Sequence, residues 1–419
     1  MYRAIHKCRI CGSEQLERVL SLGTQMLTGV FPDTRDESIT SGPLSLVKCD
    51  GGDDVCGLLQ LEHTFDHAEM YGDNYGYRSG LNPTMVSHLE AKVARIRRSI
   101  QLENGDLVVD VGSNDGTTLK AYPSSGLVLA GIDPTAEKFR QFYPSHIQIL
   151  PDFFSLALMQ QAFGERRARV ITSFSMFYDL EDPMAFMREI HGALADDGIW
   201  VFEQSHMPTM VAMNAYDTIC HEHLEFYAMR QIKWMTDRTG FVIVDVEFNE
   251  VNGGSFSVTV AKQGHGTQTA LLSSILDDEE RRGFNTLTPY LAFADRVASL
   301  RTELQRFVWN ARAAGKTVAA LGASTKGNVI LQFCGFTEQD VQCIGEVNPE
   351  KFGCFAPGTW IPIVPQQQLL QQNPDYLLIL PWHFRSFFIS KSAFSGRRLV
   401  FPLPRLEIVE TTRAEPLAG

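Results

Sequence analysis

Residues 107–116 read Leu107-Val-Val-Asp110-Val-Gly112-Ser-Asn114-Asp115-Gly116, and the fold class follows from this pattern. Its apolar half predicts a buried strand, and its glycine-rich half predicts a turn that leads into a helix. Gly112 lets the backbone turn sharply, and Gly116 lets a ligand or the helix approach closely. A second predicted strand, over 127–132, ends in Asp133, whose carboxylate can accept hydrogen bonds from ribose hydroxyls at the edge of a sheet. The pattern predicts a Rossmann-like domain that binds a nucleoside.

The spacing of this turn distinguishes between nucleoside cofactors. A dinucleotide-binding turn reads G-x-G-x-x-G, whereas this turn places Asp115 between its two glycines. A carboxylate there would repel a pyrophosphate but would receive the cationic amino-acid end of S-adenosylmethionine (SAM). The turn therefore predicts a SAM methyltransferase motif, and a purely structural glycine turn is the alternative. The predicted cofactor-binding residues are Asp110, Gly112, Asn114, Asp115, Gly116, Asp133 and Pro134, with Asp152 and Phe153 after a third strand, where they would bracket an adenine ring.

Further strands alternate with helical stretches. Strands are predicted at 147–150, 170–177 and 198–203, and this alternation indicates an α/β fold with a doubly wound parallel sheet. Residues 317–328 again read strand, glycine turn and helix, with Lys326 near the start of the helix, a combination that suits an anion. This predicts a second Rossmann-like domain. It shows no obvious ribose acid, so we expect no second SAM site.

Four of the eight cysteines, Cys8, Cys11, Cys49 and Cys56, lie near the N-terminus. The first pair is C-x-x-C followed by glycine, a turn from which two thiolates reach one ion, while the second pair is wider and encloses acidic residues. Four thiolates match a closed, structural zinc site, which leaves no position for a substrate. The alternatives are four unrelated thiols or a redox pair, although no thioredoxin-like pattern surrounds Cys8 and Cys11.

The string Cys220-His221-Glu222-His223 places two histidines around a glutamate. It is not the H-E-x-x-H zinc helix, and residues two apart share a face only in an extended segment. A neutral histidine can remove a moderately acidic proton, and a neighbouring carboxylate can orient its ring or stabilise its cation. The string therefore favours acid–base chemistry. The alternatives are a metal site, for which no clear third ligand follows, and a pair of structural histidines.

The composition is typical of a soluble globular protein. At roughly 100–200 residues per domain, 419 residues give two to four domains. The 44% hydrophobic and 21% charged residues exclude a largely disordered chain. The net charge of −12 disfavours nucleic acid and anionic membranes as partners. We find neither a run of about 20 apolar residues nor an apolar signal core, and expect a cytoplasmic, monomeric protein.

Several motifs follow one another along nearly the whole chain. They are the cysteine pairs, Tyr75-Gly-Tyr77-Arg78-Ser79-Gly80, the glycine turn, the His-Glu-His string, Asn252-Gly-Gly-Ser255, Gly322-Ala-Ser324-Thr-Lys326-Gly-Asn328, Pro357-Gly-Thr-Trp-Ile-Pro362 and Pro381-Trp382-His383. In this order they resemble the SAM-dependent C-methyltransferases that act on nucleotide-linked 4-keto-6-deoxy sugars. The resemblance implies a zinc-binding domain at 1–70, a SAM methyltransferase domain at 71–285, and a Rossmann-like domain for the sugar nucleotide at 286–419.

The resemblance also implies roles for individual residues. His223 would be the base, with Glu222 beside it and Tyr75 or Tyr77 near the sugar oxygens. The family often has tyrosine at the position of Cys220, which leaves open the group that stabilises the enolate oxygen. The residues expected to bind substrate are Arg78, Ser79, His221, Ser324, Lys326, Asn328, Trp382 and His383, of which Trp382 either stacks on a base or packs in the core.

The implied reaction is methylation of the sugar at C3. A ketone at C4 acidifies the C3 proton, a base removes this proton to give an enolate, and C3 attacks the methyl group of SAM. Two other functions stay open. One is SAM-dependent methylation of an oxygen or nitrogen, which needs no enolate. The other is a zinc-stapled module that binds SAM or a sugar nucleotide without turnover.

Overall fold

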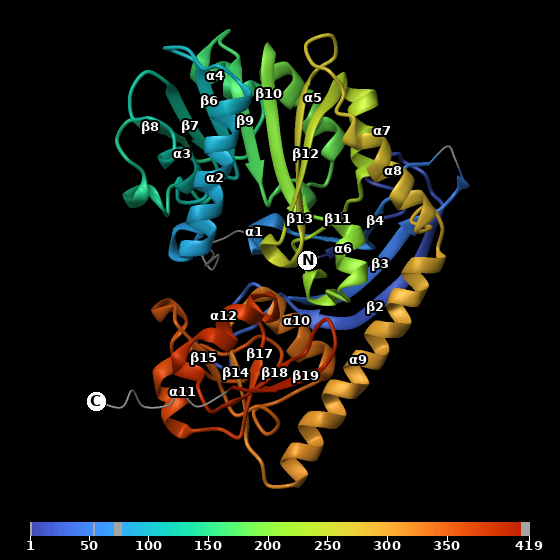
Figure 1. Cartoon of the computed structure of the whole chain (residues 1–419), viewed down its shortest axis with the longest axis vertical. Helices are drawn as coiled ribbons and strands as arrows, with labels where there is room; N and C mark the ends of the chain where they lie inside the picture. Colours follow the sequence, from blue (N-terminus) through green and yellow to red (C-terminus); the bar gives the residue numbers. More distant parts are fainter. Residues whose placement is uncertain (1, 53–54, 71–77, 412–419) are drawn as a thin grey trace.

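The computed structural model describes residues 2–52, 55–70 and 78–411. A seven-stranded sheet forms its upper part in Figure 1. Neighbouring strands from β10 to β8 run parallel, and β13 and β12 extend the sheet as antiparallel strands that the sequence analysis does not predict. The order across the sheet is β12 (Phe241–Asn249), β13 (Ser255–Lys262), β10 (Leu194–Ser205), β9 (Ala168–Phe174), β6 (Leu107–Val111), β7 (Val128–Ile132) and β8 (Ile147–Leu150).

Successive residues of β6 face opposite sides of this sheet, and helices cover both sides. Val108 belongs to a core cluster with α2 (Pro83–Ser99) and α3 (Thr117–Lys120). Val109 belongs to a separate cluster on the other side. That cluster includes residues of α4 (Leu156–Phe163), α5 (Pro183–Ala193), α7 (Met229–Thr239) and α8 (Leu271–Arg281). The parallel, doubly wound α/β architecture is therefore confirmed, because such strands must be apolar on both faces.

A six-stranded sheet forms the lower part of the molecule (Figure 1). Its strands are parallel except for the last pair, β18 and β19. Helices α10 (Thr325–Cys334), α11 (Gln366–Gln372) and α12 (Arg385–Ser390) accompany it. The strand order is β16 (Ile363–Pro365), β15 (Ile344–Glu346), β14 (Val318–Leu321), β17 (Tyr376–Ile379), β18 (Arg398–Phe401) and β19 (Glu407–Glu410).

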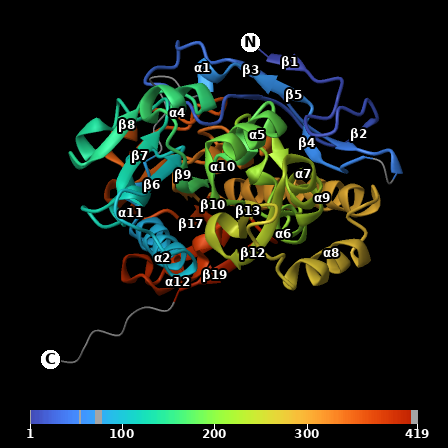
Figure 2. The ribbon, with the colours of Figure 1, turned by 90° about the horizontal axis from the view of Figure 1, so that it is seen from above.

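The N-terminal strands form a third sheet, which also includes β11, a strand from far along the chain. Its order is β11 (Glu225–Phe226), β4 (Leu59–Leu61), β3 (Ser41–Cys49) and β2 (Leu16–Met26). A separate pair joins β1 (Tyr2–Ala4) to β5 (His63–Phe65). Figure 2 shows these strands along one rim of the molecule. Because β11 begins two residues after His223, the N-terminal sheet holds one end of the His-Glu-His string.

The 26-residue helix α9 (Thr288–Ala313) runs along the outside from the upper part to the lower part (Figure 1). Its buried face consists of Tyr290, Phe293, Val297, Leu300, Leu304, Val308 and Ala311, at the spacing of an amphipathic helix. Across the described ranges, no helix combines the length and apolar character needed to cross a membrane.

Candidate active site

A cavity of about 210 Å³ opens where β6, β7, β8 and β9 end. The chain reverses direction across the sheet between β6 and β9, and ligands bind at such switch points. The predicted cofactor residues that line the cavity are Asp110, Gly112, Asn114, Asp133, Pro134, Asp152 and Phe153, and Ser79 joins them from the predicted substrate set. Phe153 is an exposed member of this lining.

The carboxylate of Asp133 is fixed at the mouth of this cavity. Its Oδ2 accepts a hydrogen bond from the backbone N–H of Asn114 at 2.8 Å, and its Oδ1 accepts from the backbone and hydroxyl of Thr135. Carboxylate oxygens can accept further hydrogen bonds. The acid therefore joins the glycine turn to the next strand while it keeps acceptor capacity for ribose hydroxyls, and these residues fit SAM.

Asp115 has a different surrounding from the one predicted. Its Oδ2 accepts a hydrogen bond from the backbone N–H of Gly80 at 3.1 Å and lies 3.6 Å from Nε of Arg78. The Arg78 guanidinium also stacks on Phe142, 4.0 Å from the ring centroid. Neither Asp115 nor Gly116 lines the cavity. The carboxylate thus anchors the segment before α2, and Arg78 pairs with the glycine turn. Tyr75 and Tyr77 lie outside the described residues.

Helix α2 forms part of the cavity wall, which the sequence analysis missed. It contributes Met85 and Leu89, and further apolar lining comes from Phe174, Met176 and Phe186. The start of this helix is recognisable in the sequence, because the side chain of Asn82 accepts a hydrogen bond from the backbone N–H of Thr84 and Pro83 occupies the first turn.

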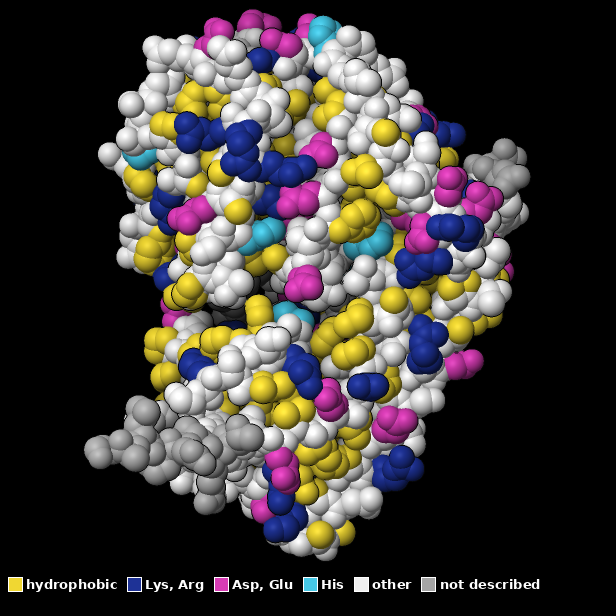
Figure 3. Space-filling model, viewed as in Figure 1, with side chains coloured by type: hydrophobic (Ala, Val, Ile, Leu, Met, Phe, Trp, Pro, Cys, Tyr) yellow, Lys and Arg dark blue, Asp and Glu magenta, His cyan; other side chains and the backbone are white. Residues whose placement is uncertain are grey.

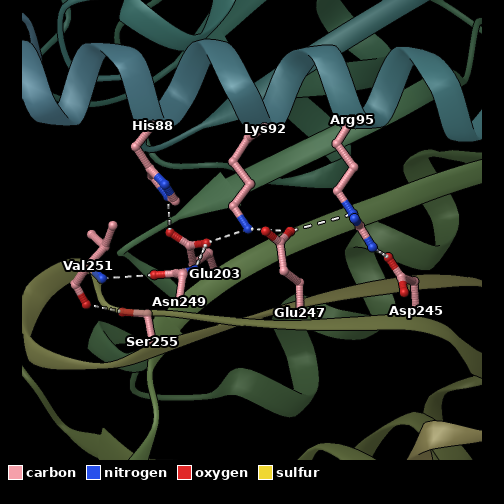
Figure 4. Close-up of polar contacts among 9 residues, drawn as sticks. All are labelled: His88, Lys92, Arg95, Glu203, Asp245, Glu247, Asn249, Val251 and Ser255. Carbon is pink, nitrogen blue, oxygen red and sulfur yellow. Dashed lines mark hydrogen bonds and ion pairs between the residues drawn. The ribbon is translucent and has the colours of Figure 1, made fainter.

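Ion pairs fasten α2 to β10 and β12 (Figure 4). The buried carboxylate of Glu203 lies 2.6 Å from His88 Nε2 and 2.7 Å from Lys92 Nζ, and it accepts a hydrogen bond from Asn249 at 2.8 Å. These partners hold the pKa of Glu203 below its usual value although burial raises it. Lys92 also pairs with Glu247 at 2.9 Å. The network fixes the helix that carries Met85 and Leu89.

The His-Glu-His string forms a turn. The backbone N–H of His223 donates to the carbonyl of Cys220, so His221 and Glu222 occupy the central positions and the two histidines do not share a face. The buried ring of His221 makes an edge contact with Phe65 in the N-terminal part. Burial lowers the pKa of His221 to about 4. The structure thus places His221 in the packing between sheets.

His223 has the geometry of a base. Its Nδ1 lies 2.7 Å from the carbonyl oxygen of Thr218, which can only accept, so Nδ1 carries the proton and Nε2 keeps its lone pair. Within the described ranges, Nε2 has no hydrogen-bond partner. Burial and the nearby charge of Lys326 lower the pKa of His223 to about 4, which keeps the ring neutral at pH 7. The ring is oriented by Thr218 and by an edge contact with Tyr178, rather than by Glu222 as predicted.

Glu222 lies where the three sheets meet. A Cβ built on Gly29 would fall 2.2 Å from its Oε1 and 3.6 Å from the hydroxyl oxygen of Thr325. The thiol of Cys220 lies 3.6 Å from its Oε2. Burial raises the pKa of Glu222 to about 7. This carboxyl therefore changes charge near neutral pH.

The C-terminal sheet brings Lys326 and His383 to the same region. Lys326 Nζ donates to the backbone carbonyl of Asn252 at 2.8 Å. Burial, and to a smaller extent the charge of Lys326, lower the pKa of His383 to about 3. Trp382 is buried and donates from Nε1 to Asp217 at 2.8 Å, so this ring packs rather than offering a stacking face. Figure 3 shows the surface hollowed between the upper and lower parts, with histidine side chains on either side.

Two other predicted substrate residues have structural contacts. Ser324 caps α10 by accepting from the backbone of Gly327 at 3.1 Å. Asn328 is fully buried and donates to the carbonyl of Thr28 at 2.8 Å. They hold the helix and the N-terminal part in place.

Glu346 is an acid that the sequence analysis did not find. It ends β15, and its Oε2 accepts from the backbone N–H of Ala323 at 2.8 Å, as Asp133 does from Asn114. Lys351 donates to the carbonyl of Ala323 at 2.9 Å. The C-terminal sheet therefore repeats the turn-and-acid arrangement of a Rossmann-like domain, with a lysine beside it.

The four N-terminal cysteines come together as predicted. The sulfurs of Cys8 and Cys56 lie 3.4 Å apart, those of Cys11 and Cys49 lie 3.5 Å apart, and all four lie within 4.8 Å of one another. Sulfur ligands at about 2.3 Å from zinc in a tetrahedron require this spacing. The thiolates therefore fit a structural zinc ion and leave no side open for a substrate.

Arg9 connects this cluster to the string that holds His223. It lies between Cys8 and Cys11, donates to the carbonyl of Leu61 at 2.6 Å, and places Nε 3.7 Å from Oε1 of Glu225. Both side chains are buried, and burial raises the pKa of Glu225 while Arg9 opposes the rise. The cysteine turn thus positions the Arg9 guanidinium beside the Glu225 carboxylate of β11.

Comparisons with known proteins agree with this arrangement. Family models match in order a zinc-binding domain at 8–71, a methyltransferase domain at 85–246 and a C-methyltransferase C-terminal domain at 250–404. The C-methyltransferase NovU of Streptomyces niveus is 28% identical over 415 residues, 97% of each chain.

Solved structures overlap a smaller share. The plantazolicin methyltransferase BpumL is 12% identical, with a TM-score of 0.34 over 43% of this chain and 86% of that one. The mitomycin 7-O-methyltransferase MmcR is 15% identical, with a TM-score of 0.34 over 43% of this chain and 55% of that one. Both overlaps are confined to less than half of the chain, whereas the family models extend from the cysteine cluster to the C-terminal sheet. Three family models therefore match the chain in order, for a zinc-binding domain, a methyltransferase domain and a C-methyltransferase C-terminal domain, and with the similarity to NovU they support SAM-dependent C-methylation as its activity.

Proposed function

We propose that this protein methylates C3 of a nucleotide-linked 4-keto-6-deoxy sugar, with His223 as the base that forms the enolate. The observation that carries the proposal is the open Nε2 of His223, which is unprotonated because Nδ1 donates to Thr218. An sp³ carbon takes a methyl group only after it has lost a proton, so a C-methyltransferase needs such a base. Methylation of an oxygen or nitrogen does not need an enolate.

In the proposed reaction, His223 Nε2 takes the C3 proton and becomes a cation. The electrons of the C3–H bond form a C3–C4 double bond, and the carbonyl electrons move to the C4 oxygen. When bound, S-adenosylmethionine would supply the methyl group that bonds to C3, with the electron pair of the broken carbon–sulfur bond left on sulfur and the ketone re-formed.

Each of the three parts of the chain would have its own role in this reaction. We propose that residues 71–285 hold SAM and the base, that residues 286–419 hold the sugar nucleotide, and that residues 1–70 form the zinc-binding domain. The resemblance of the ordered motifs to sugar C-methyltransferases supports the choice of substrate, with Arg78 and Ser79 on the SAM side of the site.

The test is mass spectrometry of the purified protein with SAM and TDP-, GDP- and CDP-linked 4-keto-6-deoxyhexoses. We expect one of them to gain a methylene mass, with the new methyl mapped to C3 by NMR. We also expect deuterium from D₂O to enter C3 without SAM. Methylation of an oxygen or nitrogen, without C3 exchange, would contradict the proposal.

A further inference from the structure

Lys326 is a half-buried cation whose hydrogen bonds are incomplete. Its ammonium has three N–H groups, and one donates to the carbonyl of Asn252 at 2.8 Å. In the part of the chain that the structure describes, the other two have no partner, and no carboxylate lies within 4.0 Å of Nζ. Burial lowers the pKa of Lys326, and Asp217 opposes this change. A desolvated ammonium with two open donors is suited to an anionic or polar ligand.

Other polar atoms around Lys326 are also unpartnered. Oδ1 of the buried Asp217 and Nδ1 of His383 have no hydrogen bond among the described residues. The charge of Lys326 acts on His223 and on His383, since it contributes to the lowered pKa of both. A buried polar atom without a partner destabilises the folded chain. A polar ligand bound beside Lys326 would supply the partners that these atoms lack, and Lys326 also acts electrostatically on His223, whose Nε2 is open.

The charges favour a transient anion over a permanent one. A nucleotide diphosphate carries two negative charges and would meet Lys326 together with the carboxylate of Asp217. A single ammonium with a carboxylate behind it is better matched to one negative charge that develops during the reaction. Such a charge appears on the C4 oxygen when His223 removes the C3 proton.

We propose that Lys326 donates a hydrogen bond to the C4 oxygen of the sugar and stabilises the enolate that His223 forms. The inference rests on the proposed function. In this step the C3–H electron pair becomes the second bond between C3 and C4, and the carbonyl pair becomes the charge on the C4 oxygen, which Lys326 faces. The ammonium keeps its proton. The Lys326 ammonium would thus stabilise the enolate oxygen in a chain that has Cys220 where the family often has a tyrosine hydroxyl.

The experiment compares Lys326→Met with Lys326→Arg and with Lys316→Met. Lys316 is the control, because it is a lysine just before β14 of the same sheet, and its Nζ pairs with Asp375 at 2.9 Å. Removal of one oxyanion donor typically lowers kcat about 10²–10³-fold. We expect Lys326→Met to lower both methylation and SAM-independent deuterium entry at C3 by about 100-fold or more. The KM for the sugar nucleotide should change little, Lys316→Met should keep wild-type rates, and Lys326→Arg should recover part of the loss.

Binding of the free nucleoside diphosphate and of SAM is measured by calorimetry for each variant. If Lys326→Met binds the nucleoside diphosphate more weakly and keeps the wild-type kcat, Lys326 contacts the diphosphate and the inference is overturned. Deuterium exchange at C3 at the wild-type rate in Lys326→Met would also overturn it. If Lys326→Met does not fold, Lys326→Gln, which keeps a donor for Asn252 but no charge, gives the same comparison. The wild-type reaction is run first, so a wild type that neither exchanges C3 nor methylates the sugar is recognised as failure of the proposed function itself.

Discussion

Nδ1 of His223 donates to the carbonyl oxygen of Thr218, 2.7 Å away, and this contact fixes which ring nitrogen can accept a proton. Replacement of His223 by Gln should therefore lower methylation and C3 deuterium entry by about 10²–10⁴-fold, the range of general-base catalysis. SAM affinity, measured by calorimetry, should stay within a small factor of wild type, because His223 does not line the cofactor cavity. Turnover at wild-type rate would remove His223 as the base.

Asp133→Ala should weaken SAM binding. A hydrogen bond to a charged group contributes about 1.5–3 kcal/mol, which corresponds to about 10–100-fold in Kd. Thr135→Val is the control, because it removes only one donor to this carboxylate and leaves the acid in place. Equal Kd values for the two variants would show that the carboxylate makes no direct contact with the cofactor.

Zinc content should depend on Cys49. We expect elemental analysis to find one zinc ion per chain in the wild type and none in Cys49→Ser, with a lower unfolding temperature for the variant, because a tetrahedral site with one ligand removed binds zinc weakly. Cys343→Ser, in the C-terminal sheet and outside the cysteine cluster, should retain zinc. A Cys49→Ser protein with full zinc content would contradict the four-cysteine site.

The Glu203 carboxylate should be important for stability. Glu203→Gln leaves the buried Lys92 without its closest counter-charge, and the loss of one partner from a buried ion pair costs about 3–5 kcal/mol. Urea unfolding should show this decrease in the free energy of unfolding. Glu247→Gln, which alters the half-exposed partner of the same lysine, should cost about 1 kcal/mol or less. Similar losses in the two variants would refute the dominant role of Glu203.

His221 should make the protein less stable in acid. Burial lowers its pKa from 6.5 to about 4, so between pH 6.5 and pH 4 His221 is protonated in the unfolded chain and neutral in the folded chain. The free energy of unfolding is therefore lost as pH falls from 6.5 to 4, by up to about 3 kcal/mol. His221→Phe should remove this part of the loss. Urea unfolding at pH 7, 5.5 and 4 checks it, and parallel pH profiles for wild type and variant would contradict the prediction.

Much of the fold could be predicted from local patterns. The strand before Gly112, the acid at Asp133 and the C-x-x-C turn at Cys8 are short-range features, because a strand, a tight turn and a metal knuckle each need particular residues at fixed spacing. At Gly112 and Gly116 the backbone has φ of 74° and 72°, a region that glycine enters at low cost. These stretches therefore identified the parallel sheet, the SAM cavity and the cysteine cluster.

The pairing of distant segments could not be predicted in this way. The strand β11 joins the N-terminal sheet through contacts with β4, more than 150 residues earlier in the chain, and Glu203 of β10 contacts His88 of α2. No periodicity in either segment indicates its partner, because such contacts depend on how whole sheets pack. The same limit explains why Asp115, Trp382 and Asn328 looked suited to ligands and proved to have partners within the protein.

The chemical groups of this protein can be read from its sequence: four thiolates at metal spacing, a glycine turn followed by a ribose acid, and histidines beside a glutamate. How these groups are used depends on the packing of distant segments. The turn at Cys220 sends His221 into the core and leaves His223 with an open nitrogen, and the lower sheet brings Lys326 to the same region. The physical reason is that a proton affinity depends on burial and neighbouring charges, which come from segments far apart in the chain.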